Sequence, residues 1–259
     1  MIATPEAAPA GPLTTDAVLG GRLRLTQPAK GHRVGHDALL LAAAAPADAR
    51  HLVDLGAGVG SAGLAALLRL PQADALLVEI DPALAALAQG NAETNGLAPR
   101  CRVVTGDVCA LARKGGLAPD AAGAFDLVLS NPPFNAAHAH QTSPDADRAR
   151  AHMAAPETLR DWMTAAYRCL APGGTLAMIL RPEDLAALLS GLDGRFGAAE
   201  LLPIHPRPGR PAVRLIVRAI KGRRTAPVML PSFILADGEG RASAQADAVL
   251  RDLSPLPGR

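Results

Sequence analysis

A glycine-rich loop between two apolar segments is the feature that most constrains the fold. His51–Leu55 is predicted to form a strand, residues 54–60 read Asp-Leu-Gly-Ala-Gly-Val-Gly, and Ser61–Leu70 is predicted to form a helix. Glycines let the backbone turn sharply and approach a ligand closely, and a helix N-terminus presents oriented N–H groups. The stretch therefore predicts a ligand-binding strand–loop–helix unit, whose candidate contacts are Gly56, Gly58 and Gly60.

Acidic residues lie at the ends of the next two predicted strands. Strand 75–80 closes at Glu79, where a carboxylate can accept both hydroxyls of a ribose; simple solvent exposure is the alternative. Asp81-Pro82 then predicts an N-cap with proline at the first helical position, for a helix that ends near Thr94. Strand 101–105 leads to Asp107, which either accepts the amine of a cofactor adenine or caps the following helix.

The alternation of strands and helices at short spacing predicts the fold class. It indicates an α/β protein with a doubly wound, mostly parallel sheet and right-handed crossovers. The glycine loop and the two acids follow the carboxyl ends of strands, where such sheets bind ligands. Helix 156–170, strand 175–180 after a turn at 172–174, helix 183–192 and a hairpin of strands 199–204 and 212–220 complete the prediction.

The fourth strand ends in an unusual turn. Residues 125–134 read Phe-Asp-Leu-Val-Leu-Ser-Asn-Pro-Pro-Phe, an apolar run that stops at an amide, two prolines and a ring. The prolines fix their own φ and lack N–H groups, so the turn is stiff and offers acceptors only. The Asn131 amide oxygen and the Pro132 carbonyl can converge on a planar NH2 group that stacks on Phe134. The candidate catalytic residues are therefore Asn131, Pro132, Pro133 and Phe134, although Asn-Pro-Pro alone is also an ordinary turn signal.

Composition narrows the class of protein. Nearly half of the 259 residues are apolar but only 2% are aromatic, which predicts an aliphatic core. The net charge of +2 demands no acidic partner. Three cysteines without paired spacing favour buried thiols in a reducing cytoplasm, and the sequence predicts no metal site. We expect no signal peptide or membrane segment, and therefore a cytoplasmic protein.

The two ends of the chain and its flanking loops complete the domain organisation. Residues 1–15 are predicted to be a disordered segment, 16–253 a single domain and 254–259 a loose tail. A short hairpin or an extended arm is expected over Val18–Thr26. Asp37 precedes the apolar helix 38–45, where it is either an N-cap or first-turn acid of that helix or a cofactor contact. Residues 135–155 have no clean periodicity and are predicted to form a mobile, substrate-facing loop.

Basic residues cluster late in the chain. Between Leu201 and Ala236 there are seven arginines or lysines and no acidic residue. This predicts a basic, phosphate-contacting face, with solubilising charge on an edge strand as the alternative. The candidate RNA contacts are Arg207, Arg210, Arg214, Lys221 and Arg223.

The motifs together resemble a known family. Residues 30–45 (KGHRVGHDALLLAAAA), 54–60, Glu79, the region of Asn91 and Asn95, 126–134, the segment SPDADRARAH and the strand PAVRLIVRAIKG resemble the bacterial tRNA adenine-N6-methyltransferases that modify valine tRNA. These belong to the class I S-adenosylmethionine-dependent enzymes, whose amino-methylating members carry Asn/Asp-Pro-Pro-aromatic after the fourth strand. The chain departs from the family at Gly35-His36-Asp37-Ala38, and in having Phe134 where tyrosine is usual.

The resemblance implies a Rossmann-like sheet of seven strands, one antiparallel, with helices on both faces. It implies S-adenosylmethionine as cofactor and a tRNA or other RNA as partner, with either a monomer or a dimer. The implied roles are ribose binding for Glu79, adenine binding for Asp107, and target-base binding for residues 131–134. The implied cofactor contacts are Asp37, Asp54, Gly56, Gly58, Gly60, Glu79, Asp107 and Asn131.

The predicted activity is therefore methyl transfer to the exocyclic N6 amine of an adenine in tRNA. Relatives with the same signature methylate guanine in ribosomal RNA or a glutamine side chain in a protein, and both remain alternatives. Gly58, Gly60 and Gly63 also satisfy G-x-G-x-x-G, so an NAD-dependent oxidoreductase is a more distant alternative, although it leaves the Asn-Pro-Pro-Phe turn without a role. A non-catalytic RNA-binding module is a further alternative.

Overall fold

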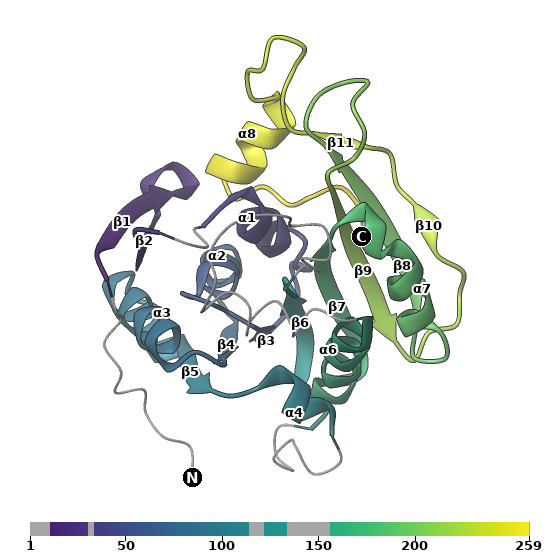
Figure 1. Cartoon of the computed structure of the whole chain (residues 1–259), viewed down its shortest axis with the longest axis horizontal. Coiled ribbons are helices and arrows are strands. Elements are labelled where there is room, and N and C mark those ends of the chain that lie inside the picture. The colour runs from purple at the N-terminus through teal and green to yellow at the C-terminus, as the bar shows by residue number, and fades with distance from the viewer. Residues whose placement is uncertain (1–10, 31–33, 114–121, 134–155, 259) are drawn as a thin grey trace, which may run out of the picture.

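Two layers of helices enclose one twisted sheet in the computed structural model (Figure 1). The structure describes residues 11–30, 34–113, 122–133 and 156–258. The parallel half of the sheet contains β3 (His51–Leu55), β4 (Asp74–Glu79), β5 (Cys101–Thr105), β6 (Phe125–Ser130) and β7 (Leu170–Leu180). The other half contains β8 (Phe196–His205), β9 (Arg214–Lys221), β10 (Val228–Met229) and β11 (Phe233–Ile234).

The strand order confirms the predicted fold class and corrects the strand count. The order is β10-β8-β9-β7-β6-β3-β4-β5, with β11 also pairing with β8, which makes nine strands instead of seven. The two extra strands have two residues each and run parallel to β8, too short to predict from a pattern. Only β9 runs antiparallel, to β7 on one side and β8 on the other. The predicted turn at 172–174 lies inside β7, which is longer than expected.

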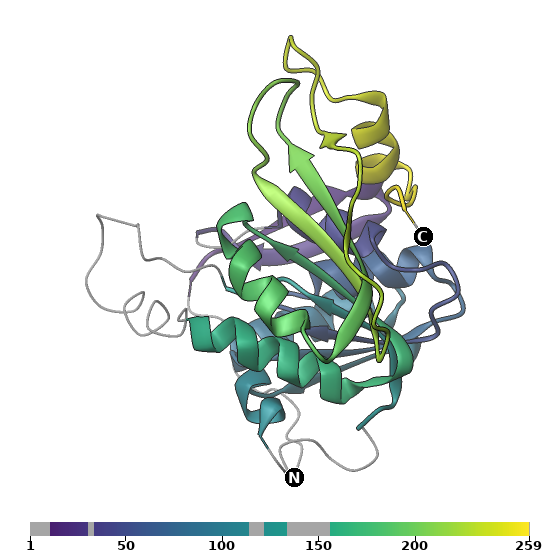
Figure 2. The same cartoon turned by 90° about the vertical axis from the view of Figure 1, so that its right-hand side faces the viewer.

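The helices divide between the two faces of the sheet. One face is covered by α1 (His36–Ala43), α2 (Ser61–Arg69), α3 (Pro82–Thr94) and α8 (Ala244–Arg251). The other is covered by α4 (Val108–Ala112), α6 (Pro156–Cys169) and α7 (Leu185–Leu192). Short 3-10 turns lie at Leu19–Gly21, Ala98–Arg100 and Pro182–Asp184. Figure 2 shows the sheet from the side, with the β8–β9 hairpin and α8 projecting beyond the parallel strands.

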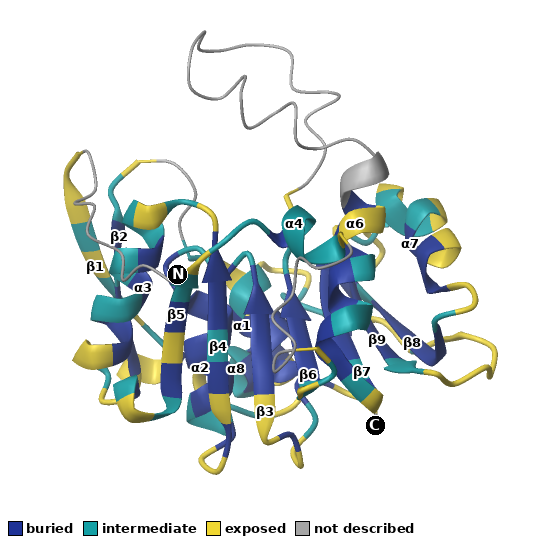
Figure 3. Cartoon of the chain, turned by 90° about the horizontal axis from the view of Figure 1, so that it is seen from below, coloured by how far each residue is buried: buried dark blue, intermediate teal, exposed yellow. Residues whose placement is uncertain are grey.

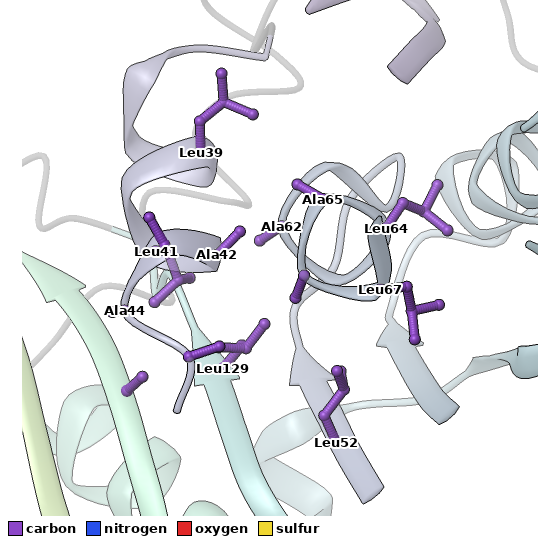
Figure 4. Close-up of a cluster of buried hydrophobic side chains, with 14 of the residues drawn as sticks. Leu39, Leu41, Ala42, Ala44, Leu52, Ala62, Leu64, Ala65, Leu67 and Leu129 are labelled. Atoms are coloured by element: carbon purple, nitrogen blue, oxygen red, sulfur yellow. The ribbon is translucent and has the colours of Figure 1, made fainter. Parts of the chain in front are cut away.

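The core is aliphatic, as the composition predicts. Alternate residues of β6 point to opposite faces, with Leu127 and Leu129 beneath α1 and α2, and Val128 beneath α6. Alanines allow α1 and α2 to pack closely, and Figure 4 shows Ala42 and Ala62 facing each other above Leu129. Central strands β3 and β6 are buried on both faces for most of their length (Figure 3), which explains why they read as continuous apolar runs.

An N-terminal hairpin packs beside this domain. It pairs β1 (Leu13–Val18) with β2 (Leu23–Pro28), so the predicted hairpin is confirmed with longer strands. The predicted disordered segment 1–15 is wrong for residues 13–15, which belong to β1. Asn91 of α3 and Asn95, the C-cap of that helix, anchor β2 through paired amide bonds, Asn95 to the backbone of Arg24 and Asn91 to that of Thr26.

The C-terminal residues are bound instead of loose. The Leu256 N–H donates to the Ala43 carbonyl at 2.9 Å, and the Leu256 side chain is buried. Arg218 donates to the Pro257 carbonyl. The predicted loose tail 254–259 is therefore wrong for these residues, because an apolar side chain and a buried arginine fix them. Within the ranges that the structure describes, no helix is long and apolar enough to span a membrane.

Candidate active site

The candidate site lies where the parallel strands end, the edge that faces the viewer in Figure 1 and upward in Figure 3. Leu55 of β3 pairs with Ser130 of β6, and Glu79 of β4 pairs with Thr105 of β5. The glycine loop, Glu79, Asp107 and Asn131 therefore follow one row of neighbouring strand ends. The prediction that these motifs share one edge of the sheet is confirmed.

Three glycines shape the glycine loop: all three have positive φ, and they differ in what surrounds each Cβ position. Gly56, Gly58 and Gly60 have φ of +75°, +57° and +87°, a region that side chains disfavour. At Gly56 a Cβ would also collide with the Trp162 ring of α6, and at Gly60 it would press on Leu64 and Leu77. At Gly58 no atom of the described residues lies within 4 Å of the Cβ position. The open space beside Gly58 lets a ligand approach the backbone.

Glu79 is the most strongly organised acid at this edge. It is only 7% exposed, and its Oε2 accepts from the Gly58 N–H at 2.8 Å while Oε1 accepts from the Asp81 N–H at 2.9 Å. The carboxylate therefore joins the loops that follow β3 and β4. A carboxylate has about four acceptor positions, so two remain after these bonds. The arrangement suits a ligand that presents two hydroxyls.

Asp54 has a structural contact within the same loop. It is 2% exposed and its Oδ2 accepts from the Gly63 N–H of α2 at 2.8 Å. Burial raises the pKa of this carboxyl to about 7, against the lowering effect of the Gly63 N–H and with a further increase from Glu79. This contact fixes α2 against β3 behind the glycines, so the observed role of Asp54 is to hold the loop; its predicted contact with a cofactor stays a prediction.

The alternative interpretations of Asp37 and Asp107 separate in the structure. Asp107 caps α4, since its Oδ1 accepts from the Cys109 N–H at 2.8 Å. Asp37 does not cap α1, whose N-cap is Gly35, but it lies in the first turn of the helix, so the prediction of a first-turn acid is confirmed. Asp37 Oδ2 instead pairs with Arg214 Nε at 2.7 Å. That ion pair neutralises an acid beside the site.

Asn131 ends the row with an unsatisfied acceptor. It lies immediately after β6, half-buried, and its Oδ1 is buried with no hydrogen-bond partner in the part of the chain that the structure describes. Pro132 is buried and Pro133 is exposed. Phe134 and the predicted loop 135–155 lie outside the described residues. A buried acceptor without a donor costs about 1–3 kcal/mol and calls for an explanation.

The predicted single basic face is wrong. Arg214 begins β9 at the carboxyl edge, whereas Lys221 ends β9 seven residues later, about 23 Å away at the opposite edge. Lys221 donates to the Leu170 carbonyl at 2.5 Å and lies over the Tyr167 ring, and burial lowers its pKa. Arg223 lies beyond it, at the same far edge. Only Arg207, Arg210 and Arg214 flank the carboxyl edge.

Sequence reasoning did not predict the contacts by which two further residues support this site. Trp162 packs against Gly56 from α6, and Asn91 Nδ2 donates to the Val59 carbonyl of the glycine loop at 3.0 Å as well as to β2. Trp162 is the sole tryptophan in the chain, and this rarity is the signal in the sequence that could have identified it. Asn91 gives no local signal, because its partners lie 32 and 65 residues away.

Most of the chain matches proteins of a known family. Residues 33–203 match the family described as Methyltransferase small domain. The chain belongs to the methyltransferase small domain family. This membership confirms methyl transfer as the class of reaction and S-adenosylmethionine as the cofactor. It also removes the NAD-dependent oxidoreductase alternative.

Relatives and solved structures agree with this assignment. The chain is 32% identical over 190 residues to a Porphyromonas gingivalis protein named tRNA1(Val) (adenine(37)-N6)-methyltransferase, covering 71% of this chain and 72% of the relative. It is 30% identical over 221 residues to the protein of that name from Shewanella, covering 82% and 88%.

Two solved structures resemble the fold. The chain matches a structure from Agrobacterium tumefaciens, described as a predicted O-methyltransferase, with a TM-score of 0.72 and 30% identity over 86% of this chain and 99% of that one. A 16S rRNA N2 G1207 methyltransferase from T. thermophilus matches with a TM-score of 0.57 at 22% identity, over 82% of this chain and 51% of that one. The second match shows the fold alone.

Proposed function

We propose that this methyltransferase modifies the exocyclic N6 amine of an adenine in tRNA. The relatives named tRNA1(Val) (adenine(37)-N6)-methyltransferase support this substrate, since the chain covers most of their length. The observation that carries the proposal is the buried Asn131 Oδ1 without a donor, at the end of the strand next to the glycine loop. An exocyclic amine supplies that missing donor.

The residues around the glycine loop fit S-adenosylmethionine. Glu79 has two acceptor positions left for the ribose hydroxyls, and the open space at Gly58 allows the ligand to approach the backbone. The remaining predicted contacts, Asp107 with the adenine and Asp37 with the cofactor, belong to this proposal. When bound, the cofactor supplies an electrophilic methyl group.

The protein's part in the reaction is to orient and polarise the amine. The lone pair of an aromatic amine is delocalised into the ring, so the amine is a poor nucleophile. Asn131 Oδ1 and the Pro132 carbonyl accept its N–H groups, which favours tetrahedral geometry and stabilises the positive charge that develops on nitrogen. A well-placed group of this kind contributes about 3–4 kcal/mol. No general base is needed, because the methylated ammonium loses its proton readily to water.

The target base must be unstacked to reach Asn131. RNA-modifying proteins act on bases that are splayed out of loops and stacked on aromatic rings. Phe134 is the ring that the sequence provides immediately after the two prolines. Guanine in ribosomal RNA and a protein glutamine also present a planar NH2 group, so the same site chemistry admits them as alternative substrates.

Substitution of Asn131 tests the role of its side chain. Asn131→Ala should reduce kcat for methyl transfer by about 100-fold or more, because one preorganised transition-state contact is lost. The Kd for S-adenosylmethionine, measured by calorimetry, should change less than about threefold. Asn131→Asp keeps an acceptor and should recover part of the rate. Turnover by Asn131→Ala at the wild-type rate would remove this residue from the mechanism.

A further inference from the structure

A cleft of ≈ 670 Å³ lies between the N-terminal hairpin, the start of α1, the loop after β8 and the residues from 235 to the end of α8. Figure 1 shows α8 above α1 and the β1–β2 hairpin to the left of that helix. Its floor is apolar, with Leu39 from α1, Leu235 beyond β11 and Leu250 from α8. No element of the parallel sheet lines it, so this cleft is separate from the candidate active site.

The hairpin wall of the cleft is fixed to the cofactor loop. Asn91, 1% exposed, exchanges amide bonds with Thr26 of β2 and also donates to the Val59 carbonyl. Buried Gln27 donates to Asp16 at 2.5 Å and accepts from the Val34 N–H at 2.7 Å, which ties the hairpin to the segment before α1. A wall held this way is preorganised and loses little freedom when a ligand binds.

The cleft is lined by more positive than negative side chains, and one positive side chain has no acidic partner among the described residues. Its one carboxylate, Asp247, pairs with Arg251 at 3.0 Å. Arg207 forms the opposite wall and its guanidinium makes no hydrogen bond or ion pair with any residue in the described ranges. His36 completes the wall at the first position of α1. An unpaired arginine over an apolar floor suits a ligand that is both flat and anionic.

The cleft opens near the predicted catalytic turn. His36 precedes Asp37, which is bonded to Arg214 at the end of β9. β9 adjoins β7, and β7 adjoins β6, whose end carries Asn131. Two strand spacings, about 10 Å, therefore separate Arg214 from the Asn131 side of the sheet. His36 lines the cleft and adjoins Asp37, whose ion pair with Arg214 connects this side of the cleft to the end of β9 at the carboxyl edge.

We propose that this cleft binds a nucleotide that flanks the target adenine in the RNA substrate. The base lies on the apolar floor and its phosphate is bound by Arg207, a combination that single-stranded RNA recognition uses widely. The inference rests on the proposed function, because it assigns a second nucleotide site to the same RNA. It also makes the hairpin and α8, two elements outside the parallel sheet, the parts that select the substrate.

Charge reversal at Arg207 tests the proposal against a matched control. Arg207→Glu should weaken binding of a valine tRNA transcript by about tenfold and reduce the slope of log Kd against log salt by about one. Arg223→Glu makes the same change in charge at the far edge of the sheet and should alter the tRNA Kd by less than about twofold. Calorimetry should give the same Kd for S-adenosylmethionine in both variants, and melting curves check that both fold.

A second variant tests the cleft without changing its charge. Ala242, an exposed residue on the rim, becomes tryptophan in Ala242→Trp and fills the space. It should weaken tRNA binding as Arg207→Glu does. Equal tRNA affinity in Arg207→Glu and Arg223→Glu would overturn the proposal and leave the cleft to a protein partner.

The same assays separate this inference from the proposed function. Wild-type protein that transfers no methyl group to adenine contradicts the proposed function itself. Wild-type protein that methylates adenine, while Arg207→Glu and Ala242→Trp bind tRNA normally, contradicts only the assignment of the cleft.

Discussion

Asp54 shows, at the scale of a single side chain, how a motif residue can have a structural contact that its motif does not predict. The sequence places it at the start of the glycine stretch, and the resemblance implies a cofactor contact. In the structure its carboxyl is buried against the Gly63 N–H, and burial raises its pKa from 3.8 to about 7. Burial could not be predicted from the motif, because it depends on how α2 packs onto β3.

This raised pKa predicts a pH-dependent stability. The folded state binds the Asp54 proton more tightly than the unfolded chain does, so the group leaves the free energy of unfolding unchanged below about pH 4. Between about pH 4 and 7 that free energy falls as pH rises, and it levels off above. Relative to Asp54→Asn, the cofactor-free protein should lose about 2 kcal/mol between pH 5 and 8. Urea unfolding at both pH values measures this, and a constant difference between the two proteins would refute it.

Glu79 is the residue whose predicted role the geometry supports most directly. Both oxygens already accept backbone N–H groups and keep positions for two hydroxyls. Glu79→Gln removes the charge and one acceptor, so binding of S-adenosylmethionine should weaken about tenfold or more, as expected for hydrogen bonds to a charged group. Calorimetry provides the test, with Glu93→Gln on the outer face of α3 as the control. An unchanged affinity for Glu79→Gln would contradict ribose binding.

At the scale of elements, the parallel strands and the antiparallel hairpin of β8 and β9 both follow from the sequence, but the placement of the basic side chains on β9 does not. Strand–helix alternation and the Asp81 N-cap predict β3, β4 and α3 closely. The direction of β9 carries Arg214 and Lys221 to opposite edges, although the sequence suggests one basic cluster. Basic residues that are close in sequence can lie far apart in space when they occupy the two ends of one strand. Whether Arg214 and Lys221 share a surface therefore depends on the length and direction of β9.

The composition of the C-terminal residues 254–258 did not indicate that they are bound to the domain. Leu256 is 3% exposed, and the neighbouring Pro257 carbonyl accepts from Arg218, which pairs with Glu200 inside the sheet layer. Leu256→Ala should lower the free energy of unfolding by about 2–3 kcal/mol, the cost of removing a buried leucine side chain. Leu189→Ala, at a residue 40% exposed on α7, is the control and should cost much less. Equal midpoints in urea for the two variants would show that the segment is loose.

At the scale of the whole molecule, function depends on parts that are far apart in the chain. The row of ligand positions along one sheet edge was predictable, because parallel strands bring their carboxyl ends together. The cleft was not, since its walls come from residues around 17–39 and 206–251, and no local pattern links them. The amide bonds of Asn91 connect one wall to the glycine loop. The proposed nucleotide cleft and the proposed cofactor site are therefore connected through Asn91.

The identity of the methylated atom tests the central claim most directly. Wild-type protein would be incubated with methyl-labelled S-adenosylmethionine and total RNA or protein, and the products would be digested and analysed by mass spectrometry. Label in N6-methyladenosine from valine tRNA is the predicted result, absent with Asn131→Ala. Label in N2-methylguanosine, in a ribose 2′-O-methyl group or in protein glutamine would contradict it.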